Sequence, residues 1–234
     1  MIQIKPNNNI ITSISNALIV SVEDMGKWLN LAPSAITMQQ DMLSELIVMA
    51  TELVENYTWV NLRRKTIEAY YLLDCDCFCG LCNGFVELIL NRSPLLSTDD
   101  ITKIEYLSNN GWVEFDRGTM TISGLYENTT ENIDIRNWGS IYFREPIEYQ
   151  DRLNAYKVRV TYNSGFDPVD TTAAKIPTLY KMAIKKIAAF HYTNRGDCAS
   201  ECSISGVPVP CDVKGMLAQK AISKTVMGGE YAVC

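Results

Sequence analysis

Residues 38–57 read MQQDMLSELIVMATELVENY, and this stretch predicts a long helix. Its apolar side chains recur every three or four residues, which places them on one face of a helix. They are Leu43, Leu46, Ile47, Ala50, Val54 and Tyr57. Thr37 and Gln40 match a capping box, in which each side chain binds a free backbone N–H of the first turn. We therefore expect a long amphipathic helix that contributes one face to a helical core.

Two further helical patterns accompany this helix. Ser21 and Asp24 form a second capping box at the start of a helix predicted over about 22–30, which we expect Pro33 to end. A third helix is predicted over 176–195, and its apolar stripe consists of Tyr180, Ala183, Ile184, Ile187 and His191. The sequence thus predicts three main helices.

The chain between these helices has a different character. It is rich in β-branched and aromatic residues, and turn signals such as Asn109-Asn110-Gly111 occur at short intervals. Strands are predicted over 66–73, 85–90, 101–107, 112–115, 120–122, 133–135, 140–143 and 156–162. We therefore expect an α+β fold: a small antiparallel helical core that carries a β-rich insertion over 66–162.

The two ends of the chain show no regular spacing of apolar residues. Residues 1–20 are predicted to form an extended N-terminal arm, because their polar Asn run and proline give no helical spacing. Residues 196–234 are predicted to form a C-terminal tail with a short helix over 212–226. The core of the protein is expected to span 21–195.

Composition excludes several classes of function. The 234 residues are 47% hydrophobic, and 21 Lys+Arg against 27 Asp+Glu give a net charge of −6. An acidic chain has no overall positive field for reading nucleic acid. His191 is the single histidine, and we expect it to be buried and hydrogen-bonded. Because no phosphate-binding loop, dinucleotide fingerprint or nucleophile elbow occurs, we expect no enzyme, no catalytic residue and no cofactor.

The sequence also bears on compartment. No stretch approaches the roughly 20 apolar residues that span a bilayer, and the N-terminus does not match a signal peptide. We therefore expect no membrane contact and synthesis in a cytosol. In that compartment the eight cysteines are expected to be free thiols.

The stretch DCDCFCGLC is the sharpest local feature, with four cysteines: Cys75, Cys77, Cys79 and Cys82. Four thiolates can bind zinc, although only the last pair has the C-x₂-C spacing of a zinc knuckle. Cys198 and Cys202 offer a second knuckle, and Cys211 lies nearby. The alternative, which we favour, is a hairpin with reduced thiols on its strands. Zinc is therefore retained as the lesser of two interpretations.

Two basic spots are candidate interfaces. One lies on the third helix and the other where the long helix meets the first predicted strand. Their residues are Arg63, Arg64, Lys181, Lys185, Lys186 and Arg195. They could contact acidic neighbours or form solvated faces.

The order of these segments carries a resemblance. The series consists of SVEDMGKWL (21–29), VENYT (54–58), KTIEAY (65–70), NRSPLLST (91–98), IEYL (104–107), VRVTYNSGF (158–166), IPTLYKMAI (176–184) and HYTNR (191–195). It resembles the head–tail connector, or head-completion adaptor, proteins of bacteriophages over about 21–195. Asn91 departs from the family, which often has proline there.

The resemblance implies a structural virion protein at the head–tail junction. Such proteins form a ring, typically of twelve copies, that binds the portal protein and docks the next tail or ring protein. The ring extends the channel through which double-stranded DNA passes without specific binding. The competing hypothesis is a zinc-stabilised intracellular protein-binding module built around the hairpin Cys75–Cys82.

Overall fold

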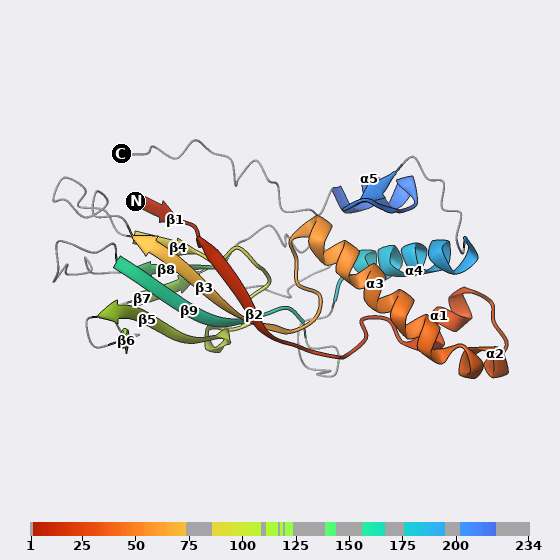
Figure 1. Cartoon of the computed structure of the whole chain (residues 1–234), viewed down its shortest axis with the longest axis horizontal. Helices are drawn as coiled ribbons and strands as arrows, with labels where there is room; N and C mark the ends of the chain where they lie inside the picture. Colours follow the sequence, from red (N-terminus) through yellow and green to blue (C-terminus); the bar gives the residue numbers. More distant parts are fainter. Residues whose placement is uncertain are drawn as a thin grey trace.

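The computed structural model describes residues 2–73, 86–108, 111–116, 118, 120–123, 139–143, 156–166, 176–194 and 202–218. Two β-sheets form one end of the elongated molecule, and helices form the other (Figure 1). Each end has its own hydrophobic core. The α+β prediction is thereby confirmed.

The larger sheet is fully antiparallel. Its order is β2 (Asn8–Ile14), β3 (Lys65–Leu73), β9 (Tyr156–Ser164), β5 (Ile101–Ser108) and β6 (Gly111–Glu114). Side chains alternate between its faces, so that Ile67, Ala69 and Tyr71 of β3 are all buried on one side. Strands β2 and β6 lie at the two edges of this sheet.

The smaller sheet covers the buried face of the larger one. Its order is β1 (Ile2–Ile4), β4 (Val86–Ile89), β8 (Ser140–Phe143) and β7 (Met120–Ser123), with β1 parallel to β4. Leu88, Ile141 and Phe143 from this sheet share one core with Val158 and Tyr162 of β9. The β end is thus a two-layer sandwich.

The helical end contains α1 (Val22–Trp28), α2 (Pro33–Met38), α3 (Gln40–Thr58), α4 (Thr178–Thr193) and α5 (Cys211–Ala218). Helices α3 and α4 lie side by side (Figure 1), and their apolar stripes form most of the helical core. The predicted stripe residues of α3 include Leu43, Ile47, Ala50 and Val54, all fully buried. The three main helices therefore lie close to their predicted ranges.

The helix ends differ from prediction in two places. Ser21 caps α1 as expected, since its Oγ accepts the N–H of Asp24 at 3.0 Å. Thr37 does not cap α3, because its hydroxyl instead donates to the carbonyl of Pro33 at 3.2 Å. Helix α1 ends at Trp28, so Pro33 does not end it as predicted but begins α2, where a first-turn proline loses no hydrogen bond.

The two ends of the chain are more ordered than predicted. Residues of the expected N-terminal arm form β1 and β2, one strand in each sheet. The small hairpin of β10 (Ser203–Ile204) and β11 (Val207–Pro208) precedes α5, and this region packs into the helical core. Its buried side chains are Ile204, Val209, Val213 and Leu217. Residues 202–218 are therefore part of the fold, and deleting 200–234 would remove part of its core.

Most predicted strands lie within two residues of observed ones. The strand predicted over 133–135 falls outside the described residues, as does the predicted helix beyond Ala218.

Candidate functional site

The last turn of α3 holds a buried carboxylate at the junction of the two cores. Glu55 is 1% exposed. Its Oε1 accepts the backbone N–H groups of Leu62 at 2.7 Å and Arg63 at 2.9 Å. Its Oε2 accepts from Lys65 Nζ at 2.8 Å and from Arg63 Nη2 at 3.3 Å. One side chain of α3 thus fixes the chain that leads into β3.

A second ion pair lies on the other side of this connection. Arg64 pairs with Asp100 and also donates to the carbonyl of Gly165 at 3.3 Å. The other oxygen of Asp100 accepts the N–H groups of Leu96 at 2.7 Å and Ser97 at 3.0 Å. The pair therefore ties the start of β3 to the end of β9 and to the short 3₁₀ helix over Thr98–Asp100.

Gly165 shows how closely the chain packs at the junction. Its φ is +105°, and a Cβ there would lie 2.3 Å from the carbonyl oxygen of Arg63. Only glycine accommodates both the left-handed backbone and this contact. Nearby, the guanidinium of Arg92 lies 4.8 Å from the ring centre of Trp59, and burial lowers the pKa of Arg92.

The five interface candidates that the structure describes lie in two separate places. Arg63 and Arg64 lie at the junction, where their acidic partners belong to the same chain. The side chain of Arg63 is 10% exposed. These two residues therefore stabilise the monomer. Arg195 falls outside the described residues.

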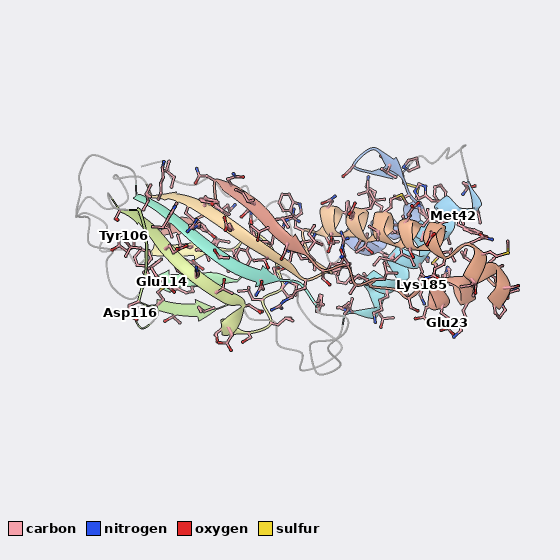
Figure 2. The ribbon with its side chains drawn as sticks, turned by 60° about the horizontal axis from the view of Figure 1, so that its bottom comes forward. Glu23, Met42, Tyr106, Glu114, Asp116 and Lys185 are labelled. Carbon is pink, nitrogen blue, oxygen red and sulfur yellow. A yellow bond between two sulfur atoms is a disulfide. The ribbon has the colours of Figure 1, made fainter. Side chains whose placement is uncertain are left out.

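The three lysines lie on α4 at the helical end. Lys181 is exposed, and Lys185 has its Nζ 5.7 Å from the ring centre of Trp28 on α1. Lys186 pairs with Asp212 of α5, and this hydrogen bond lowers the pKa of Asp212. Figure 2 shows Lys185 and Glu23 at the helical end, far from Tyr106, Glu114 and Asp116 at the sheet end. Lys181 and Lys185 thus remain candidates for contacts with another molecule.

The cysteine prediction needs correction. Cys202 and Cys211 form a disulfide across the β10–β11 hairpin, so these two are not free thiols. The hairpin brings them together by pairing Ser203 with Pro208. Cys75, Cys77, Cys79, Cys82 and Cys198 fall outside the described residues. Within the described ranges no group of His, Cys, Asp and Glu side chains is arranged to hold a metal ion.

His191 has a structural setting. Its Nε2 lies 2.9 Å from the carbonyl oxygen of Pro208, and its ring contacts Phe190 edge-on. The ring is half-buried, whereas we expected it to be buried. It therefore helps to hold the β10–β11 hairpin on α4.

Exposed apolar side chains are the surface feature that the sequence analysis missed. They lie on strands β2, β3, β5 and β6 of the larger sheet and on helices α1, α2 and α4. In that order they are Ile10, Ile11, Ile14, Leu72, Leu107, Val113, Trp28, Met38 and Met182. The isoleucines next to the Asn run of 7–9 were the available signal, since apolar residues there belong to no helical stripe. Among the described helices, none has the length and apolar character needed to cross a bilayer.

Solved structures with a similar fold exist, although the sequence comparisons found no match. No protein-family model matches the chain, and no curated protein matches it in sequence. One similar solved structure is a chain from the neck of an empty gene transfer agent particle computed with C6 symmetry. It is 14% identical with a TM-score of 0.62, and the match covers 92% of this chain and 95% of the other. Another is a chain from the virion of a native gene transfer agent particle, at 11% identity and TM-score 0.57, with the same coverage.

Proposed function

We propose that this chain is a structural neck protein of a phage-like particle, acting as a head–tail connector. The observation that carries the proposal is the likeness to the neck chain along 92% of this chain. The ordered motifs that resemble the connector family support the same role independently of the structure.

In this role the chain forms a ring, typically of twelve copies, under the portal vertex. The ring extends the DNA channel and docks the next tail or ring protein, and it needs no catalytic residue or cofactor. The net charge of −6 suits a channel that lets DNA pass without holding it. The protein would be made in the host cytoplasm and end in the virion.

The α4 lysines are the proposed contact with an acidic neighbour. Lys181 and Lys185 are on an outward part of the helix, next to the exposed side chains of Trp28 and Met182. Basic side chains around apolar ones are suited to a protein interface. Arg63 and Arg64 take no part, because both are used at the junction.

Two measurements test the function. Mass photometry and negative-stain microscopy of the purified chain should show rings, and mass spectrometry of purified particles should find the chain at constant stoichiometry. A chain that stays monomeric at every concentration and is absent from particles would overturn the proposal.

A charge reversal tests the α4 contact. The double variant Lys181→Glu/Lys185→Glu should lower incorporation into particles, because it reverses the charge that faces the acidic neighbour. Lys103→Glu, at an exposed site on β5, is the matched control. Equal incorporation of both variants would show that the α4 lysines are merely solvated.

A further inference from the structure

The larger sheet has two open edges that lie on opposite sides of it. Strand β2 pairs only with β3, and β6 pairs only with β5, within the part of the chain that the structure describes. Each outer edge therefore presents backbone N–H and C=O groups that no described strand pairs. Such edges are templates for a strand from another molecule.

The β2 edge has little of the usual protection along its first four residues. Its sequence NNIITSI contains no charged residue and no proline, and Ile10, Ile11 and Ile14 are 45–46% exposed. Monomeric proteins commonly place lysine, proline or a bulge on such an edge. The bulge in β2 falls between Ile11 and Ser13, so that the four residues Asn8–Ile11 stay in regular register.

The β6 edge is short and acidic. Its four residues Gly111–Glu114 include Val113, which is 39% exposed. Glu114 lies directly opposite Glu105 of β5, whose carboxylate pairs with Arg159 of β9, and Asp116 follows. Figure 2 shows Glu114 and Asp116 together at this side of the sheet.

We propose that the β2 edge of one copy pairs with the β6 edge of the next, so that the larger sheet continues from subunit to subunit. The regular part of β2 and the whole of β6 are both four residues long. Two β6 edges would repel each other through Glu114, whereas the uncharged β2 edge accepts it. Two β2 edges would pair about a two-fold axis and stop at a dimer.

The dimensions suit a ring. Five strands at about 4.8 Å span about 24 Å, so twelve copies would close at a circumference of about 290 Å and a diameter of about 90 Å. A wall of two sheets about 10 Å apart leaves a wide central opening. This inference rests on the proposed function, which includes a ring, and it identifies the two strand edges that join neighbouring copies in that ring.

Hydrogen exchange on the full chain tests the pairing directly. Peptides covering 8–14 and 111–116 should exchange at least about tenfold more slowly in assembled rings than in the dilute chain, because strand pairing protects edge amides. Rings in which neither peptide changes would overturn this inference and leave the proposed function standing. Protection of 8–14 alone would also overturn it.

A charge rescue identifies the partner edge. Ile10→Asp should reduce ring formation at least about tenfold, since it places an acid beside Glu114 of the next copy. Adding Glu114→Lys to the same chain should restore rings, and Met38→Asp on α2 is the control for lost apolar surface. Normal ring formation by Ile10→Asp would show that β2 does not pair with β6. The same conclusion would follow if the double variant has the circular dichroism of the wild type and still forms no rings. A wild-type chain that forms no ring and is absent from particles refutes the proposed function itself.

Discussion

At the scale of single residues, Glu55 is the most constrained side chain of the molecule. It is removed from water, yet both oxygens bind two donors each. A buried carboxylate is tolerated only when charge and hydrogen bonds both compensate its lost hydration. The same carboxylate is the buried counter-charge that Arg63 and Lys65 share, so the three residues depend on one another.

Glu55→Gln should therefore destabilise the protein strongly. The amide leaves Arg63 and Lys65 without their buried counter-charge, and we expect a loss of about 3–5 kcal/mol in the free energy of unfolding. Urea unfolding followed by circular dichroism measures it. Glu52→Gln is the matched control: Glu52 also contacts Arg63, at 3.2 Å, but its side chain is 55% exposed, so the loss should stay below about 1 kcal/mol. Equal losses would show that the exposed and buried contacts are equivalent.

Tyr71 makes stability depend on alkaline pH. Burial raises the pKa of Tyr71 well above its ordinary value near 10. Above about pH 10 the unfolded chain releases this proton while the folded chain keeps it. The free energy of unfolding therefore falls by up to about 1.4 kcal/mol per pH unit.

Tyr71→Phe removes the contribution of Tyr71 to this slope. At pH 7 the variant should lose about 1 kcal/mol, because the carbonyl of Ile89 loses the donor now 2.9 Å away. Between pH 10 and 11 its stability should fall less steeply than that of the wild type. Urea unfolding of the wild type and the variant at pH 10 and 11 measures the two slopes. The remaining tyrosines contribute equally to both proteins, so the difference between the slopes belongs to Tyr71. Parallel curves would contradict the prediction.

Local residue patterns predicted only local contacts. The Ser21 cap was predictable, because donor and acceptor are three residues apart. The role of Glu55 could not be predicted, because it depends on how the chain turns back after α3 through Trp59, whose backbone is left-handed. Arg63 and Arg64 looked like surface charges for the same reason. Their partners are carboxylates that only the folded chain brings to them.

At the scale of elements, helices were predicted better than terminal strands. The spacing of apolar residues defines α3 and α4 without reference to the rest of the chain. Strand β2 exists because it pairs with β3, more than 50 residues away, for example through Asn8 and Tyr70. Strand β1 is only three residues long and β2 (NNIITSI) does not alternate in hydrophobicity, so the sequence alone indicated an unpaired arm.

The Cys202–Cys211 disulfide should stabilise α5 and its hairpin. The bridge closes a loop of sequence separation 9, for which chain entropy predicts about 2–3 kcal/mol. Dithiothreitol should lower the stability of the wild type by this amount. The variant Cys202→Ser/Cys211→Ser should be as stable as the reduced wild type and insensitive to the reductant. A wild type unaffected by reductant would contradict the prediction.

At the scale of the whole molecule, two cores meet at one junction that the Glu55 and Asp100 ion pairs hold. The α+β class and the order of segments were predictable, and the solved neck structure has the same fold. The two-layer sandwich could not be predicted from the sequence, because its layers are assembled from strands that are distant in sequence. The open edges of the larger sheet emerged only with the strand order.

A ring should make stability depend on concentration. Neighbouring copies bind the folded chain and not the unfolded one, so each tenfold rise in concentration above the assembly threshold adds up to about 1.4 kcal/mol. For a chain of this size the Tm should rise by about 2–4 °C per tenfold. Scanning fluorimetry over a hundredfold range measures it. A constant Tm would indicate that copies do not assemble in that range.

The junction also has a mechanical consequence. The chain passes between the sandwich and the helices from β2 to α1, from α3 to β3 and from β9 to α4. A pull on the sandwich would load these connections in parallel and shear the Glu55 and Asp100 contacts together. Bonds sheared in parallel fail at higher force than bonds peeled one at a time. A load applied at one end of the molecule would therefore reach the other end through all three connections.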